Sequence, residues 1–394
     1  MSLADDAKLL LIPTGYKTSK VYSVFPTDGD GDFTYTRSGN ASRVNPGGLI
    51  ETVGTNIPRI DHFGGGCPTL NLEPQRTNEF TYSEEFNQSV WFKSNCTITT
   101  NQIIAPDGTL TADLATSTGN GGGVFRFSSW TTTQKTASIF VKKNISSTVE
   151  ILNASSGLNR VVFDLDSGTI TTQGGTMTGT IEDFGNGWFR LSATHATVTG
   201  NQTFGLRPAT NQSLFIWGGQ FEIGSYPTSY IKTTSGQVTR QKDQCLNGGV
   251  ADLFSSEGTI FIDVVPFKTS SSFTAISLND DSSSNRCEFF FYASSNQVRF
   301  IIAGGGGGLT LSHYETITYN QRNKMAITFK ENEAKVYLNG TLELTDTSVD
   351  EMIGLDRLEF TLFNGTLNFE GKIHDTRVYD RVLTQTEAET LTTL

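Results

Sequence analysis

Short stretches in which apolar and polar residues alternate recur along the whole chain, and clusters of Gly, Asn, Asp and Ser separate them. Alternation with a period of two is the pattern of a β-strand that buries one face, and such clusters mark the turns between strands. Runs of helix-forming residues are absent outside the two termini. The pattern therefore predicts an all-β protein.

Residues 76–245 are predicted to form an antiparallel β-sandwich. Their strands follow one another at intervals of about a dozen residues or somewhat more, which is typical of that fold. Examples are "ASIFVKK" (Ala137–Lys143) and "GWFRLSATH" (Gly187–His195). The polar segment "TSGQVTRQKD" (234–243) then separates this middle sandwich from the rest.

Residues 246–394 carry a second series of strands and predict a second antiparallel sandwich, or jelly roll, of similar size. Within it, Asn339 and Gly340 lie between two alternating stretches. Asn-Gly is a strong signal for a two-residue hairpin turn. Near the end, Thr384 stands three residues before Glu387, which is the spacing of a capping box, so we expect one short C-terminal helix there.

Residues 1–75 differ from the rest, because they hold too few apolar residues for a large core of their own. They contain short strands and an acidic stretch, "DGDGD" (Asp28–Asp32). We expect a small β-structure that packs on a neighbouring module or on copies of itself, and we call it the N-terminal module.

Charge excludes two classes of partner. The chain has 394 residues and a net charge of −11. It shows no basic patch, so we expect no binding to nucleic acid or to an anionic membrane surface. No apolar run approaches the roughly 20 residues that span a bilayer, and "KLLLIP" (Lys8–Pro13) is too short for the core of a signal peptide. We therefore expect a chain made in the cytoplasm, without a signal peptide and without membrane insertion.

The four cysteines do not form a recognisable metal or redox motif. None stands two or three residues from another, which excludes the zinc and thioredoxin-type spacings. We expect free thiols, and the sequence leaves disulfide pairing open. They are Cys67, Cys96, Cys245 and Cys287.

The last third of the chain resembles a known fold family. "NKMAITFKENEAKVYLNGTLEL", followed by "FEGKIHDTRVYDRVLTQTEAETL", resembles the closing half of a laminin-G-like, concanavalin A-like lectin/glucanase jelly roll. The last strand of that family has a pattern like G-x-I-x-D-x-R-x-Y-x-R-x-L-T-x-x-E. It is filled here by Gly371, Ile373, Asp375, Arg377, Tyr379, Arg381, Leu383, Thr384 and Glu387.

The rest of the chain resembles bacteriophage structural proteins. "TYSEEFNQSVWFKSN" and "IWGGQFEIGSYPTSYIKTTSGQVTRQKD" are similar to carbohydrate-binding-module-like sandwiches of phage fibres. The N-terminal module, with "LIETVGTNIPRID" (Leu49–Asp61), looks like the virion-anchoring leader that precedes such sandwiches. This resemblance implies a structural role for Arg59 and Asp61, which would pin the N-terminal module onto the first sandwich.

The concanavalin A-like fold also contains glucanases, so the carboxylates decide whether an enzyme is expected. Enzymes of that kind carry them on one strand as E-x-D-x-x-E, and retaining hydrolysis needs two carboxylates about 5 Å apart. Here "GTIFIDVVPF" offers only Asp263, while Glu343 and Asp346 would lie on opposite faces of a strand. We therefore expect no enzyme, and polysaccharide degradation is the least supported hypothesis.

No cofactor is expected. "DGDGD" resembles the start of a calcium loop, but Gly39 stands at the twelfth position, where such a loop needs a bidentate Glu. We predict a tight acidic turn instead. A structural calcium ion at the edge of a sandwich stays open, without identifiable ligands.

Three residues are candidate sugar contacts. Trp130 lies next to a predicted turn, where an exposed indole can stack on a sugar ring. His313 and Tyr314 follow the glycine run Gly304–Gly308 and are expected to line a site at the end of a loop. The other tryptophans, Trp91, Trp188 and Trp217, lie in the family-like stretches and are predicted core residues.

The resemblances imply a virion structural protein of a tailed phage, a tail or head fibre made in the host cytoplasm. Its N-terminal module would bind other virion proteins, and its sandwiches would recognise host-surface polysaccharide. The alternative is a purely structural decoration or collar protein that contacts only proteins. Because "KLLLIP" and "VYSVF" (Val21–Phe25) would otherwise be exposed, we expect a homo-oligomer, either a trimer or a ring. We also expect the sandwiches to fold without the N-terminal module.

Overall fold

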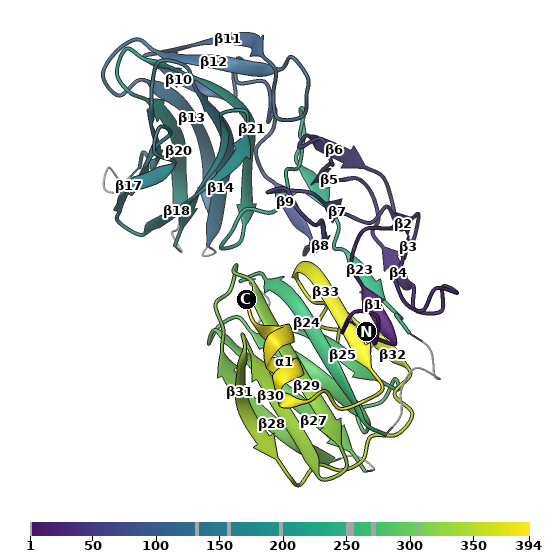
Figure 1. The fold of residues 1–394 in the computed structure, drawn as a ribbon. Coiled ribbons are helices and arrows are strands. Elements are labelled where there is room, and N and C mark those ends of the chain that lie inside the picture. Colours follow the sequence, from purple (N-terminus) through teal and green to yellow (C-terminus); the bar gives the residue numbers. More distant parts are fainter. Residues whose placement is uncertain are drawn as a thin grey trace.

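The computed structural model describes residues 2–130, 134–155, 159–196, 200–249, 256–268, 273–305 and 308–394. It confirms the expected all-β protein: the sandwich sheets are antiparallel, and α1 (Gln385–Thr392) is the one helix in this described part of the chain. Figure 1 shows two large sandwiches with the N-terminal module beside the junction between them. No helix within these ranges is long and apolar enough to span a bilayer.

The middle sandwich consists of two six-stranded sheets that enclose one hydrophobic core. Trp91 packs in that core, whereas Trp188 and Trp217 pack with Phe140 on the outer side of the second sheet, and all three tryptophans are buried as predicted. In spatial order, the first sheet contains β10 (Phe92–Ser94), β13 (Gly123–Trp130), β20 (Gly200–Pro208), β15 (Thr148–Asn153), β16 (Arg160–Asp164) and β17 (Thr169–Gly174). The second contains β11 (Cys96–Ile103), β12 (Ala112–Ser117), β21 (Ser213–Ile223), β14 (Lys135–Lys143), β19 (Trp188–His195) and β18 (Met177–Gly185).

The C-terminal sandwich packs a five-stranded sheet on an eight-stranded one. The smaller sheet contains β28 (Gly308–Thr316), β27 (Gln297–Gly304), β26 (Arg286–Tyr292), β25 (Phe273–Asn279) and β32 (Arg357–Glu359). The larger contains β31 (Thr341–Asp346), β30 (Glu333–Leu338), β29 (Asn323–Lys330), β24 (Gly258–Pro266), β33 (Gly371–Tyr379), β8 (Thr69–Leu72) and β7 (Ile60–Asp61), with β1 (Leu9–Leu11) also paired to β33. Ala388 of α1 and Leu10 of β1 cover the outer face of this larger sheet.

The N-terminal module is therefore part of the C-terminal sandwich. Strand β8 pairs with the first half of β33, and β1 pairs with the second half. Leu9, Leu11 and Val21 are fully buried in the core of that sandwich. The sequence argument that these apolar residues need other subunits to cover them is wrong, because the chain's own last strand and core cover them. The oligomer stays a prediction without that support.

The remaining strands of the N-terminal module form small sheets around the junction. They are β2 (Tyr16–Lys17), β3 (Lys20–Val21), β4 (Phe33–Thr36) and β23 (Gln244–Leu246) in one sheet, β5 (Ala41–Val44) with β6 (Ile50–Val53), and β9 (Arg76–Asn78) with β22 (Val238–Arg240). The segment that separates the two sandwiches in sequence thus returns to pair with residues near the start of the chain.

Several local predictions are confirmed. Asn339 and Gly340 have positive φ angles, 48° and 91°, and close the hairpin between β30 and β31. Thr384 and Glu387 form the capping box of α1. "DGDGD" is a tight turn in which the carboxylate of Asp28 accepts the Asp30 amide (3.0 Å). The four cysteines are free thiols.

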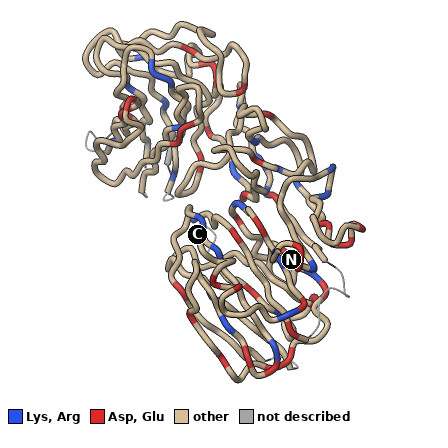
Figure 2. Tube along the Cα trace, in the orientation of Figure 1, with Lys and Arg blue, Asp and Glu red and all other residues tan. Residues whose placement is uncertain are grey.

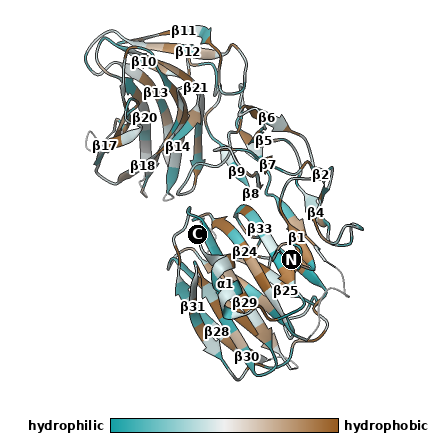
Figure 3. Cartoon of the chain, in the orientation of Figure 1, coloured by the Kyte–Doolittle hydropathy of each residue, from teal (hydrophilic) through white to brown (hydrophobic). Residues whose placement is uncertain are grey.

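Hydrophobic and charged residues are distributed as a two-sandwich protein requires. Figure 3 shows hydrophobic residues mainly on the sandwich strands, including β24, β33 and β1. Figure 2 shows Lys and Arg interspersed with Asp and Glu along the trace, without a large block of one sign.

Replacing Leu11 by Ala tests whether the N-terminal module belongs to the C-terminal sandwich. The change removes contacts from a fully buried side chain and leaves a cavity, so we expect that sandwich to lose about 2–5 kcal/mol of stability. Hydrogen exchange of the β33 amides measures this loss. All four tryptophans lie in the middle sandwich, so fluorescence follows that module separately. Thr14→Ala, at an exposed position, is the control, and unchanged exchange in β33 would contradict the shared sheet.

Candidate functional site

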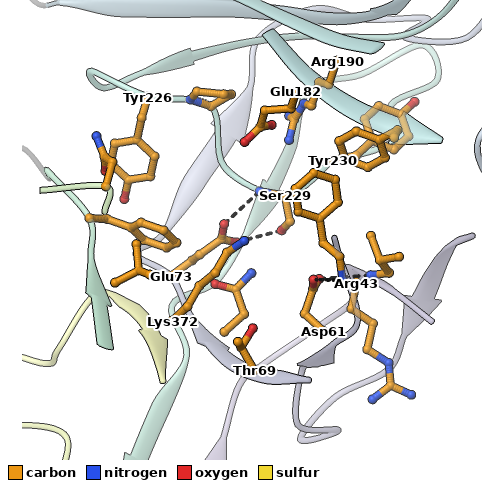
Figure 4. A pocket seen from close by; sticks show the side chains of 18 of the residues that line it. Arg43, Asp61, Thr69, Glu73, Glu182, Arg190, Tyr226, Ser229, Tyr230 and Lys372 are labelled. Carbon is orange, nitrogen blue, oxygen red and sulfur yellow. Dashed lines mark hydrogen bonds between the residues drawn. The ribbon is translucent and has the colours of Figure 1, made fainter. Parts of the chain in front are cut away.

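A cleft of about 550 Å³ lies where the N-terminal module, the middle sandwich and the C-terminal sandwich meet (Figure 4). Figure 4 shows Glu182 and Arg190 on one side of this cleft, and Asp61, Thr69 and Lys372 on the other. The first side belongs to strands β18 and β19. The second belongs to β7, β8 and the beginning of β33, where the N-terminal module joins the C-terminal sheet.

Strand alternation determines which side chains reach the cleft. On β8, Leu70 and Leu72 point into the core of the C-terminal sandwich, so Thr69 and Asn71 point away from it into the cleft. Asn71 is the register partner of Lys372 on β33, which places both on the same face. On the other side, Glu182 of β18 and Arg190 of β19 are register partners in the same way.

Aromatic side chains supply apolar surface in the cleft. Phe63, from the loop after β7, lies 4.5 Å from Phe184 of β18 between ring centroids. The ammonium of Lys372 lies 5.2 Å from the centroid of the same Phe63 ring. Farther along, the rings of Tyr226 and Phe267 are 5.1 Å apart. Aromatic faces beside polar groups are typical of small-molecule sites.

Three buried polar side chains of the cleft have an atom without a hydrogen-bond partner among the described residues. These atoms are Oδ1 of Asn71, Nε of Arg190 and the hydroxyl of Tyr226, in side chains that are at most 7% exposed. Buried polar atoms are nearly always paired, so each requires an explanation. Burial raises the pKa of Tyr226 well above its ordinary value, which keeps the hydroxyl protonated and able to donate.

Three charged groups of the cleft, those of Lys372, Arg190 and Glu182, have no ionic partner among the described residues. Within the described ranges, no carboxylate lies within 4 Å of the Lys372 ammonium or the Arg190 guanidinium. Arg190 donates to neutral oxygens, Ser138 Oγ (3.0 Å) and the Thr228 carbonyl (2.7 Å). The Glu182 carboxylate likewise has no cation within 4 Å among the residues that the structure describes. The cleft therefore presents donors, acceptors and both signs of charge to a ligand.

A buried ion cluster adjoins the cleft, which its member Glu73 lines, and joins the parts of the chain around it. Arg59 of the N-terminal module contacts Glu73 (2.6 Å) and Asp243, and Arg37 contacts Asp243 (3.3 Å). Arg240 contacts Glu73 (2.9 Å). We call Arg37, Arg59, Glu73, Arg240 and Asp243 the junction cluster. Its members are all buried, and they come from the N-terminal module and from the segment after the middle sandwich.

The junction cluster explains the Arg and Asp in "NIPRID". Arg59 also donates to Ser229 Oγ (2.7 Å), so it joins the N-terminal module to the segment that leaves the middle sandwich. The Asp61 carboxylate accepts the amides of Val44 (3.0 Å) and Phe63 (2.9 Å), which holds the Phe63 loop beside the cleft. Both residues have structural contacts, as expected. The expectation was that they pin the N-terminal module onto the middle sandwich, whereas Arg59 binds the segment that follows β21, which we call the outgoing segment.

The three sugar-contact residues predicted from sequence do not meet in one site. His313 and Tyr314 are neighbours on β28, so their side chains point to opposite faces of the sheet. His313 Nε2 contacts Glu315 Oε1 (2.7 Å) on the side of core residue Phe300. Trp130 ends β13 in the other sandwich, and its side chain lies outside the described part of the structure.

Tyr314 lies in a group of aromatic side chains on the outer face of the five-stranded sheet. Its ring is 5.6 Å from that of Tyr292, which is 5.0 Å from Phe273 and 5.2 Å from Phe290. The Arg299 guanidinium lies 5.3 Å from the Tyr314 ring. We call these five residues the aromatic surface. Phe273 and Tyr314 are exposed.

The sequence patterns did not identify the residues of the cleft. These residues come from stretches far apart in the chain, and no motif links them. The available signal was the position of some of them inside the family-like segments, such as Tyr226 in "EIGSYPTSYIK" (222–232). Among the described residues, no group of three or more His, Cys, Asp or Glu is arranged to hold a metal ion.

Residues 240–389 match a protein family, the concanavalin A-like lectin/glucanases superfamily (Laminin_G_3). The match confirms the lectin-like sandwich expected in the last third of the chain. Comparison with curated protein sequences gives no match.

Solved structures with some likeness include carbohydrate-binding and pentraxin proteins. The CBM40 of the Ruminococcus gnavus IT-sialidase bound to α2,3-sialyllactose is 17% identical, covers 38% of this chain and 94% of its own, and has a TM-score of 0.29. The leech intramolecular trans-sialidase is 15% identical over 37% of this chain and 26% of its own, with a TM-score of 0.30. A heptameric SAP-like pentraxin from Limulus polyphemus is 14% identical, covers 38% of this chain and 72% of its own, and has a TM-score of 0.29. At such low TM-scores these likenesses carry no argument about the ligand of this chain.

Replacing Glu73 by Gln tests the junction cluster. Burial alone would raise the pKa of Glu73, but the charges of Arg240 and Arg59 outweigh it and hold the pKa well below its usual range. Removing the carboxylate leaves buried cations uncompensated, so we expect a loss of about 3–5 kcal/mol at pH 7 in denaturant unfolding.

The pH dependence of this loss identifies its origin. The difference between wild type and Glu73→Gln should be full above pH 4.5, the ordinary pKa of Glu, and should shrink below it, because the unfolded chain then takes up a proton that the folded wild type resists. Glu85→Gln, at an exposed position, is the control and should change stability by less than about 0.5 kcal/mol. A difference that stays constant down to pH 3 would contradict an ionised Glu73.

Proposed function

We propose that this protein binds host-surface polysaccharide in the cleft, as a structural component of a phage particle. The observation that carries the proposal is the combination of aromatic walls with buried, unpartnered polar atoms of Asn71, Arg190 and Tyr226. The protein's own groups do not pair these atoms, so a ligand that pairs them gains hydrogen bonds.

Saccharides fit this combination of groups. Each hydroxyl both donates and accepts, so one sugar can accept from Arg190 and Tyr226 and donate to Asn71 and Glu182. The C–H faces of a pyranose ring pack on aromatic rings such as Phe63 and Phe184. The lectin-like family match of residues 240–389 supports the same ligand class.

The place in a virion is supported by the sequence resemblance of the N-terminal module and the middle sandwich to phage structural proteins. A shallow, wet sugar site binds weakly, because it must order the ligand and displace water for few contacts. Many copies on one particle convert weak contacts into durable attachment. The proposal therefore includes assembly into a trimer or ring, with the binding sites turned outward.

The proposal is binding without hydrolysis. Glycoside hydrolysis uses two carboxyl groups, one as an acid and one as a base or nucleophile. In the cleft, Glu73 is held ionised by Arg240 and Arg59, and Asp61 accepts two backbone amides. Among the described residues that line the cleft, this leaves Glu182 as a single free carboxylate, which supports a site that recognises sugar and leaves it intact.

The alternative is a purely structural virion protein, and the aromatic surface favours it. Exposed aromatic side chains with an Arg among them are enriched where proteins contact one another. In that case the aromatic surface packs against another virion protein or a second copy of this chain, and the cleft holds only water.

Replacing Tyr226 by Phe separates the two functions. The hydroxyl has no partner in the described structure, so its removal should leave stability unchanged or slightly higher. If a sugar pairs with this hydroxyl, affinity should fall about three- to tenfold, the value of one neutral hydrogen bond. A glycan array of bacterial surface polysaccharides identifies a ligand, and calorimetry then compares the variants.

The matched control for that comparison is Tyr319→Phe, which removes a buried hydroxyl outside the cleft and should leave affinity unchanged. Equal affinity of wild type and Tyr226→Phe would place the ligand elsewhere. If the folded protein retains no glycan, the glycan-binding proposal is wrong and the purely structural alternative is favoured.

Incubation with the retained polysaccharide tests for hydrolysis. We expect no reducing sugar above the level of the polysaccharide alone, because the described residues of the cleft offer no pair of free carboxylates. A reducing-end assay over a day, with Glu182→Gln as the matched control, measures this. Turnover that Glu182→Gln abolishes would overturn the non-enzymatic proposal.

A further inference from the structure

The side of the cleft that belongs to the C-terminal sandwich carries an excess of positive charge, although the whole chain has a net charge of −11. Arg322 and Lys372 line the cleft there, next to His374. The Lys324 ammonium lies near enough to affect His374 as well. This local excess requires an explanation in an acidic protein.

The nearby charges do not cancel this excess. Arg322 forms a two-bond ion pair with Asp263, through Nε (2.7 Å) and Nη2 (2.5 Å). That pair occupies the Asp263 carboxylate. Lys324 donates to a neutral carbonyl, that of Thr393 (2.7 Å). Lys372 has no carboxylate within 4 Å among the described residues.

The pKa of His374 is affected by these positive charges. Burial lowers its pKa, and the charges of Arg322, Lys372 and Lys324 lower it further against the opposing effect of Asp263. The imidazole is therefore neutral at pH 7 and adds no charge of its own. Among the described residues that line this side, Lys372 is the cation with no carboxylate within 4 Å.

The described carboxylates that line the cleft are occupied or lie across from Lys372, and Glu370, two residues before Lys372, acts electrostatically on Tyr226. Glu73 is neutralised by Arg59 and Arg240 in the junction cluster. Asp61 accepts two backbone amides. Glu182 lies on the opposite side, beside its register partner Arg190.

Lys372 is also held in position. Its ammonium lies over the Phe63 ring at 5.2 Å from the centroid, and its strand neighbour is Asn71, whose Oδ1 has no partner. A cation fixed by a ring in a half-buried cleft binds an anion more strongly than a free surface lysine does, because less side-chain freedom is lost and the local dielectric is lower.

We propose that the saccharide bound in the cleft is acidic, with its anionic group against Lys372 and its hydroxyls on Asn71, Tyr226 and Glu182. The inference rests on the proposed glycan binding and specifies its ligand class. The anionic group is the carboxylate of a uronic or nonulosonic acid, or a sulfate or phosphate ester, which offer Lys372 the same charge-assisted hydrogen bond.

The experiment compares acidic polysaccharides with their neutral counterparts. The probes are hyaluronan, alginate and polysialic acid, each also in a carboxyl-reduced form, and dextran sulfate with dextran. Affinity electrophoresis and calorimetry at low salt measure binding to the full chain. We expect at least one acidic polymer to bind about tenfold or more tightly than its neutral form.

Lysine variants assign that difference to the cleft. Lys372→Met should remove the preference for the acidic form, and Lys372→Arg should restore most of it. Lys330→Met, which removes an exposed lysine outside the cleft, should have no effect beyond a small change from long-range charge. If the tryptophan fluorescence and the β33 hydrogen exchange of Lys372→Met are the same as in the wild type, the variant is folded.

The outcomes separate this inference from the proposed function. Equal binding of acidic and neutral forms, with Tyr226→Phe weakening both, overturns the acidic ligand and keeps the glycan site. Binding of dextran sulfate without any carboxylated polymer assigns the anionic group to a sulfate ester. Failure of all probes to bind, while a neutral glycan is retained on the array, also overturns the acidic ligand. Failure of every glycan overturns both.

Discussion

The arrangement of the whole molecule depends on charges that are buried together. Arg37, Arg59 and Arg240 meet Glu73 and Asp243 in the junction cluster, away from water. Such charges are expensive to bury and stabilise only as a set, because each becomes costly when a partner is lost. The N-terminal module and the outgoing segment therefore have one favourable way to meet. The direction of the chain between the two sandwiches follows from that meeting.

The same cluster gives the cleft its shape. Glu73 follows β8 directly, and the Ser229 amide and hydroxyl donate to its carboxylate (2.9 and 2.7 Å). These bonds fix the segment with Tyr226 against the strand with Asn71. The two sides of the cleft come from different sandwiches, yet their separation is set by a rigid polar contact rather than by a flexible linker. A pre-formed site of this kind loses less entropy on binding than one that must close around its ligand.

Sequence patterns were sufficient for features that depend on neighbouring residues. The alternating strands, the Asn339-Gly340 turn and the Thr384–Glu387 cap follow from local backbone and side-chain preferences. They were insufficient where residues far apart combine. The pairing of Leu9 with Val378, the burial of Arg59 against Asp243, and the meeting of Asn71 with Lys372 have no local signature. Adjacency in sequence even misled for His313 and Tyr314, because neighbours on a strand face opposite ways.

The pairing of β1 with β33 joins segments that are made at different times during synthesis. Leu9 pairs with Val378, which is synthesised 369 residues later. At typical rates of about 5–20 residues per second, the interval is roughly 20–70 s. In that time the middle sandwich has all of its strands and can fold on the ribosome, whereas β1 has no strand to pair with until β33 is made. Strand β1 is thus synthesised before the middle sandwich but paired after it, and its apolar residues stay available for unwanted contacts in the meantime.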